Sequence, residues 1–334
     1  MEFLKRDIDF DFLSKKRAAS IVSIILIVAG LISLSSRGLN FGIDFTGGTL
    51  VEVSYENSIE VEDVRRQLRV AQFEDAQVQY YGTSSDILIR LPVRSVDNSA
   101  SISSKIMEVL RMPFLETLAE TSTGGIQQCV SESGFHACKV QMRRVEFVGP
   151  QVGGELTEKG GLAMIYALIG IMIYVAWRFE WRFALGSVAA LVHDVLITVS
   201  FFSIFGLEVS LPVLAALLAV IGYSLNDTIV IFDRIRENFR KMRKGDPTQV
   251  MNRAINNTLR RTVLTSLTTL FVVLTLLILG GEIMKGFSLA LLVGIIVGTY
   301  SSIFVASPVV LALGISREDM LPPKKEEFAP EEAP

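Results

Sequence analysis

The sequence predicts a multi-pass α-helical membrane protein, with six transmembrane helices and one α+β domain between the first helix and the second. Half of the 334 residues are hydrophobic and the mean hydropathy is +0.45, more than an ordinary soluble domain needs. Apolar runs of about 17–25 residues, the length that crosses a bilayer, recur along the chain. The composition from Arg37 to about Lys159 is instead that of a soluble domain. We therefore expect one membrane helix before this domain and five after it.

The first predicted span, residues 18–36, follows a charged N-terminal segment, residues 1–17. This segment mixes basic residues with acidic ones, whereas a cleavable signal peptide begins with a short, purely basic stretch. The acidic residues favour an uncleaved span, although the small residues at 33–36 leave cleavage as an alternative. Lys15, Lys16 and Arg17 come directly before the span, which predicts that the N-terminus lies in the cytoplasm.

Residues 37–158 have the pattern of a ferredoxin-like βαββαβ domain with its helices on one face of an antiparallel sheet. Strands are predicted from alternating apolar residues and helices from apolar residues spaced three or four apart. In chain order the predicted elements are strand 49–55, helix 59–70, strand 76–81, strand 86–91, helix 102–110 and strand 139–148.

An insertion at 116–138 does not fit the βαββαβ pattern. It contains Cys129 and Cys138, the only two cysteines of the chain. Outside the cytoplasm a disulfide between them is plausible, and two free thiols are the alternative. Zinc bound by both cysteines and His136 would lack a fourth ligand, so we predict no metal site.

Residues 159–315 predict the remaining five membrane helices. Basic residues concentrate in the N-terminus, the link 178–182, the loop 233–260 and the tail 316–334. The tail is rich in proline and glutamate, which is typical of disorder. Because cytoplasmic loops are enriched in Lys and Arg, both termini are predicted inside, and the α+β domain is predicted outside, in the periplasm of a bacterial cell. The predicted helices cover about 161–177, 183–205, 209–232, 263–279 and 287–313.

Several polar residues fall within these spans and are candidates for a proton pathway. A carboxylate at membrane depth is unfavourable by about 2.5–3.5 kcal/mol, so Asp227 and Asp194 need partners. Arg261 begins a polar stripe with Thr265, Thr268 and Thr269 that must face other helices, a partner or water. Asp227 with Arg261 predicts a site that loads and releases a proton, with Asp194 and Asn226 as weaker candidates. The alternative is that these groups only hold the helices together.

Two further alternatives are an intramembrane aspartyl protease using Asp194 and Asp227, and a structural assembly factor. The protease is disfavoured because Asp227 lies in Leu-Asn-Asp rather than in a glycine-flanked loop. No ATPase or hydrolase motif is present, so we expect a chain that is not an enzyme and has no catalytic residue.

Small and breaking residues also give predictions within the spans. Gly294 and Gly298 form a small-xxx-small pair suited to close helix packing. Pro212 and Pro308 either kink their helices or mark helix ends.

Five sequence segments resemble the SecD/SecF family of protein-export membrane subunits, on its SecF side. The similarity covers residues 18–315 in order. Its segments are Phe41-Gly-Ile-Asp-Phe-Thr-Gly-Gly-Thr-Leu50, Gly149-Pro-Gln-Val-Gly153, Ala190-Leu-Val-His-Asp-Val195, Tyr223-Ser-Leu-Asn-Asp-Thr-Ile-Val-Ile-Phe-Asp-Arg-Ile-Arg-Glu-Asn238 and Thr258-Leu-Arg-Arg-Thr-Val-Leu-Thr-Ser266. The cysteine-containing insertion is not part of the family pattern.

The resemblance implies half of an RND-like transporter that is completed by SecD in the inner membrane. It implies that the proton-motive force promotes late, periplasmic steps of preprotein export through SecYEG, after SecA has driven insertion. The family's proton-conducting Asp and Arg match Asp227 and Arg261. Implied partners are SecD, SecYEG, YajC and the unfolded preprotein, with protons as coupling ion and no cofactor. An RND-type half-exporter of lipids or small molecules is the alternative function.

Overall fold

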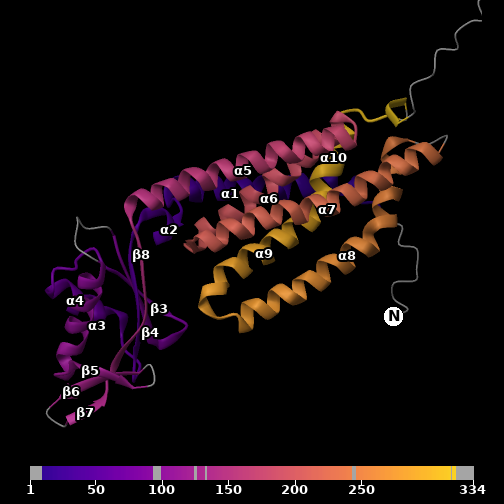
Figure 1. Cartoon of the computed structure of the whole chain (residues 1–334). Helices are drawn as coiled ribbons and strands as arrows, with labels where there is room; N and C mark the ends of the chain where they lie inside the picture. Colours follow the sequence, from indigo (N-terminus) through magenta and orange to yellow (C-terminus); the bar gives the residue numbers. More distant parts are fainter. Residues whose placement is uncertain are drawn as a thin grey trace, which may run out of the picture.

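The computed structural model describes residues 10–92, 99–123, 126–131, 134–242, 246–316 and 318–320. A bundle of long helices forms one part of the molecule and an α+β domain extends from one end of it (Figure 1). Within these residues, six helical stretches are long and apolar enough to cross a membrane, which confirms the predicted number of spans.

The first span begins with a short 3-10 turn, Leu13–Lys15, that runs into α1, Lys16–Ser36. Four long helices follow the domain: α5 (Pro150–Arg178), α6 (Trp181–Phe205), α7 (Leu211–Lys241) and α8 (Pro247–Leu279). The last span combines α9 (Gly281–Ser301), a π-helical turn (Ser302–Ala306) and α10 (Ser307–Ala312). Pro212 lies in the first turn of α7, where a missing N–H is tolerated, and Pro308 lies just after the π-helical turn inside the last span.

The structure differs from the predicted loop at 233–260, because most of this range is helical. α7 continues to Lys241 and α8 already begins at Pro247, after the N-cap Asp246. The extensions bury Ile235 and Phe239 of α7 against Met251 and Ala254 of α8 in one apolar cluster. The charged residues of this range predicted a loop, but they alternate with apolar residues at helical spacing. The apolar faces of α7 and α8 that result hold the two helices together.

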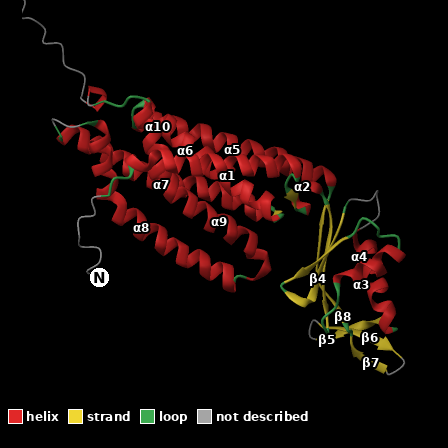
Figure 2. Ribbon diagram, turned by 180° about the vertical axis from the view of Figure 1, so that it is seen from behind, coloured by secondary structure: helices red, strands yellow, loops and turns green. Residues whose placement is uncertain are grey.

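The α+β domain confirms the predicted ferredoxin-like fold. Its sheet has the order β3-β4-β2-β8 with antiparallel neighbours. Figure 2 shows both helices on the same face of this sheet. Val51, Leu68, Ile87 and Leu110 are fully buried in the core between the two layers. The elements are β2 (Gly48–Tyr55), α3 (Val61–Val70), β3 (Gln77–Tyr81), β4 (Thr83–Leu91), α4 (Ser99–Arg111) and β8 (Val140–Val148).

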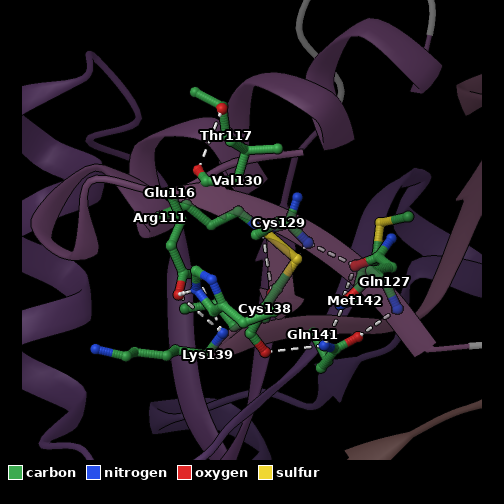
Figure 3. The surroundings of a disulfide bond; sticks show 12 residues. Arg111, Glu116, Thr117, Gln127, Cys129, Val130, Cys138, Lys139, Gln141 and Met142 are labelled. Carbon is green, nitrogen blue, oxygen red and sulfur yellow. Dashed lines mark hydrogen bonds and ion pairs between the residues drawn. A yellow bond between two sulfur atoms is a disulfide. The ribbon is translucent and has the colours of Figure 1, made fainter. Parts of the chain in front are cut away.

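The insertion forms a small antiparallel sheet of its own after a 3-10 turn at Met112–Phe114. Its strands are β5 (Thr117–Thr123), β6 (Ile126–Ser131) and β7 (Gly134–Ala137), in that order. Cys129 of β6 and Cys138, directly after β7, form a disulfide (Figure 3). Arg111 at the end of α4 connects this sheet to the main domain, because its guanidinium donates to the Val140 carbonyl and to Gln127.

The segment between α1 and the domain attaches the domain to the bundle. Here β1 (Asn40–Phe41) pairs in parallel with β9 (Glu208–Val209), the link between α6 and α7. A short helix, α2 (Ile43–Thr46), then packs on α5. A Cβ on Gly153 of α5 would lie 2.9 Å from the Phe45 carbonyl oxygen, so only glycine allows this approach.

The prediction of a disordered tail from residue 316 falls mostly outside the described residues. Within the described part, Glu318–Met320 forms a 3-10 turn. Its Asp319 pairs with Arg182 at 2.5 Å and accepts hydrogen bonds from Ser316, and these contacts hold the pKa of Asp319 below its usual value although burial opposes the shift.

Candidate functional site

Asp227 lies in the middle part of α7 and is 2% exposed. Its carboxylate has one hydrogen bond among the described residues, a long one of 3.5 Å from the Ser266 hydroxyl of α8. Ser266 also contacts the Thr299 hydroxyl of α9 at 2.7 Å. The buried hydroxyls of Thr228 and Thr262 have no hydrogen-bond partner in the described part of the chain. Asp227 is therefore a buried acid in polar but weakly bonded surroundings.

Arg261 does not pair with Asp227 here. It is exposed on α8, and no ion pair joins the two side chains in the described structure. The predicted stripe lies on the same uncovered side of α8. Thr265 and Thr268 donate to carbonyls of their own helix, a common way to satisfy threonine hydroxyls in a helix. The buried polar face of α8 is a neighbouring one, formed by Thr258, Thr262 and Ser266.

Asp194 of α6 has very different surroundings from Asp227. It is 1% exposed and its carboxylate is closely contacted from three sides. The hydroxyls of Ser224 on α7 and Ser301 on α9 donate to Oδ2 at 2.5 Å and 2.7 Å. The His193 ring lies with Nδ1 2.9 Å from Oδ1. Asp194 was a candidate from the sequence, whereas neither serine was, because only the packing of three helices brings them to one point.

The contacts of Asp194 continue through His193 to the first helix. His193 Nε2 lies 3.0 Å from the Ser23 hydroxyl of α1, and Ser23 lies 3.1 Å from the Tyr300 hydroxyl. Tyr300 donates to the Ala19 carbonyl at 2.8 Å. One polar network therefore joins α1, α6, α7 and α9.

The two buried aspartates can do different things chemically. A carboxylate with three close polar neighbours is stabilised in place, which suits Asp194 to holding helices together. A carboxylate with one long contact leaves most of its hydrogen-bonding capacity unused, which is unfavourable away from water. Among the described residues, Asp227 is thus the buried acid with the weaker hydrogen-bonding support of the two. The two acids accept from different donors and do not form a protease-like pair in the described structure.

Two other polar residues of α7 lie outside this arrangement. Asn226 is exposed, so the structure does not bring it to Asp227. Asp233 is also exposed and lies 3.5 Å from Arg178 at the end of α5.

Asp44 connects this helix to the α+β domain. Its carboxylate accepts a hydrogen bond of 2.8 Å from the backbone N–H of Leu211, the first residue of α7. Next to it, Arg90 of the domain sheet forms an ion pair with Glu208 of the α6–α7 link. The start of the helix that bears Asp227 is therefore bound directly to the domain.

His136 of the insertion pairs with an acid instead of completing a metal site. Its Nε2–H donates to Glu116 at 2.9 Å, and its Nδ1 lies 3.2 Å from the Gly134 carbonyl. Since both neighbouring oxygens are acceptors, the doubly protonated ring fits best, and the hydrogen bond to Glu116 raises the pKa of His136. No group of three or more His, Cys, Asp or Glu suited to a metal occurs among the described residues.

Comparison with known proteins identifies the family. The profile for "Protein export membrane protein SecD/SecF, C-terminal" matches residues 127–316, and that for "SecD/SecF GG Motif" matches residues 32–59. The chain belongs to the SecD/SecF family. Its SecF relatives include "Protein translocase subunit SecF" of Vibrio alginolyticus, 48% identical over 97% of this chain and 96% of the relative. The SecF protein of Pseudomonas aeruginosa is 43% identical over 94% of both chains.

Two solved SecDF structures support the same assignment. The chain matches SecDF of Thermus thermophilus, described as a translocon-associated membrane protein, with a TM-score of 0.76 and 38% identity over 92% of its length. A second SecDF structure, in a "super-membrane-facing form", gives a TM-score of 0.64 at 37% identity. The chain spans about two-fifths of each solved SecDF chain, covering 39% of it.

Proposed function

We propose that this chain is the SecF-type half of a proton-driven auxiliary unit of protein export. It works with a SecD partner in the inner membrane, with both termini in the cytoplasm and the α+β domain in the periplasm. The unit promotes the late, periplasmic steps of preprotein export through SecYEG after SecA-driven insertion, with protons as the coupling ion and YajC as a further partner. The observation that carries the proposal is the buried and weakly bonded Asp227.

The uncovered face of α8 supports a second half. α8 packs mainly against α7 and α9 and lies at the edge of the bundle (Figures 1 and 2). Only 17% of its apolar span is buried within the chain, against 50% for α7. The uncovered face includes Arg261, which lipid tails cannot satisfy. We therefore assign this face to SecD, whose docking would surround both Asp227 and Arg261 with protein.

The orientation follows from the charge distribution. Lys16 begins α1, Arg178 ends α5, and Arg234 and Arg253 lie in the last part of α7 and the first part of α8. These parts of the four helices lie far from the α+β domain (Figure 1). Basic residues mark the cytoplasmic side, so the domain faces the periplasm, where the exported chain emerges.

Protonation of Asp227 would move the α+β domain by way of α7, the helix that connects the two. Moving one proton charge across the membrane makes about 2.3 kcal/mol available per 100 mV. Neutralising Asp227 changes how α7 fits between α8 and α9, and α7 begins at the backbone N–H held by Asp44. A shift of α7 along or around its axis would thus reach the domain through Asp44 and through the Arg90–Glu208 ion pair.

The test is preprotein export into inverted membrane vesicles that contain SecD, the SecYEG channel, SecA and ATP. Asp227→Asn should remove the stimulation that a proton gradient adds, while ATP-driven export and assembly with SecD continue. Asp233→Asn is the matched control, because Asp233 is an exposed carboxylate on the same helix. Normal proton-dependent export by the Asp227→Asn variant would exclude the proposed role.

A further inference from the structure

A groove of about 780 Å³ runs between α1, α6 and the segment from the π-helical turn to α10. Its walls are mostly apolar, with Ile24 of α1, Val192 of α6 and Val309 of α10 on its three sides, and Ser20, Ser23 and His193 add polar groups to the lining. Asp227, Ser266 and Arg261 do not line it, so it is separate from the Asp227 site, whereas it borders the Asp194 network at His193 and Ser23. The groove is also open to the membrane, because Ile24 is 58% and Val192 40% exposed.

One end of the groove is positively charged. Lys16 and Arg17, in the first turn of α1, line it there. Neither forms an ion pair with a carboxylate in the described part of the chain. The neighbouring Lys15 is different, since its ammonium group lies 4.3 Å from the centre of the Phe10 ring. Two cations that pair with no carboxylate among the described residues therefore lie where an apolar groove meets the membrane surface.

The length of the groove fits one leaflet of the bilayer. Its α1 wall extends from Lys16 to Ile27, which at about 1.5 Å per residue is roughly 16 Å. This is about half of the roughly 30 Å hydrocarbon thickness of a membrane. A transmembrane helix of a partner would need the full thickness, whereas an acyl chain whose headgroup lies at the surface needs only half.

We propose that this groove binds an anionic phospholipid, with an acyl chain along Ile24 and Val192 and the phosphate group at Lys16 and Arg17. The apolar walls provide affinity for the chain, and Lys16 and Arg17 select a negatively charged headgroup. Each basic residue near the membrane surface favours an anionic lipid by about 1 kcal/mol, which is about five-fold. This inference is independent of the proposed proton site, because it involves neither Asp227 nor proton flux.

Quenching of a single tryptophan by bromine-labelled lipids tests the site. The two native tryptophans, Trp177 and Trp181, are replaced by Phe in the full chain, and Val192→Trp introduces a probe in the groove. The protein is reconstituted in phosphatidylcholine vesicles containing brominated phosphatidylglycerol or brominated phosphatidylcholine. Ile169→Trp on α5 is the matched control, since Ile169 is 44% exposed and lies nine residues from the end of its helix.

The groove probe should prefer phosphatidylglycerol over phosphatidylcholine at least five-fold more strongly than the control probe. Lys16→Gln with Arg17→Gln should lower this preference to that of the control. Equal quenching by both lipids at the two probes would overturn the proposal. Absence of quenching by either lipid at the groove probe would also overturn it, because a protein segment would then cover the groove.

A second measurement avoids placing tryptophan in the groove. Native mass spectrometry can count the phosphatidylglycerol molecules that the full chain retains in detergent. The Lys16→Gln, Arg17→Gln pair should retain fewer than Arg253→Gln with Arg260→Gln, which removes two exposed charges from α8 at the same end of the bundle. Equal retention by the two double variants would contradict the proposed site.

Discussion

The contact between α7 and α9 allows a quantitative test of the packing that forms the site. A Cβ atom added to Gly294 would lie 2.2 Å from Val220 Cγ2 and 2.6 Å from Val220 Cγ1. Carbon atoms in contact are normally about 3.5–4.0 Å apart, so the Gly294→Ala variant must separate the helices or move Val220. Val220 is held in place because a β-branched residue has one strongly preferred rotamer in a helix.

Overpacking of this kind is unfavourable by about 1–3 kcal/mol. The alanine itself favours the helix by about 0.5–1 kcal/mol over glycine, so Gly294→Ala should lower the free energy of unfolding by up to about 2.5 kcal/mol. Gly222→Ala on α7 is the control, because no atom lies within 4 Å of the added Cβ. That variant should be as stable as the parent chain or up to about 1 kcal/mol more stable.

The assay is unfolding in mixed detergent micelles, with the loss of helical circular dichroism as signal. Adding Val220→Ala to Gly294→Ala removes both Cγ atoms and leaves a Cβ contact of 3.0 Å, so stability should return in part. If Gly294→Ala were as stable as Gly222→Ala, α7 and α9 could not be as close as the structure has them. The positions of Ser224 and Ser301 around Asp194 would then also be in doubt.

Three further predictions concern the domain and its attachment. Replacing Cys129 and Cys138 by serine should lower the stability of the insertion by roughly 2–3 kcal/mol, measured as faster amide exchange in β6, while β2 keeps its protection. The raised pKa of His136 means that its pair with Glu116 stabilises the insertion fully below about pH 6.5 and loses this effect as the pH rises through that pKa. Amide hydrogen exchange in β7 should therefore rise with pH by more than its intrinsic pH dependence. Glu116→Gln should abolish this additional rise. Asp44→Ala should remove the cap of α7, about 0.5–2 kcal/mol, and reduce proton-stimulated export but not ATP-driven export; unchanged proton stimulation would argue against this link.

The sequence was sufficient for the number of membrane helices and for the fold of the domain. Both depend on local patterns that tertiary contacts reinforce. The alternation at 49–55 and the helical spacing at 59–70 agree with β2 and α3 to within two residues. The small pair Gly294 and Gly298 also packs closely, against Val220 and Ser224 of α7.

The orientation of α8 could not be predicted from its own residues. Arg261, Thr265 and Thr268 share one face, while Thr258, Thr262 and Ser266 share the next, and both contain polar groups at helical spacing. Threonine and serine can bond to their own helix, so composition does not say which face is buried. Arg261 lies on the outer face of α8 because, in the proposed assembly, this face contacts SecD.

The hydrogen-bond partners of the two aspartates could not be predicted from the sequence either. Ser23, Ser224 and Ser301 lie in three separate spans, and serine is common in membrane helices. Only packing at close glycine contacts shows that Ser224 and Ser301 meet at Asp194. The insertion was missed as a sheet because its strands do not alternate clearly between apolar and polar residues.

The most direct measurement of the central claim is the protonation of Asp227 itself. Infrared difference spectra of the chain with its SecD partner in vesicles would follow the carbonyl band of a protonated carboxyl group during a drop in pH. We expect a buried carboxyl band in the parent chain and in Asp194→Asn, and its loss in Asp227→Asn. A band that persists in Asp227→Asn and disappears in Asp194→Asn would contradict the assignment of the proton site to Asp227.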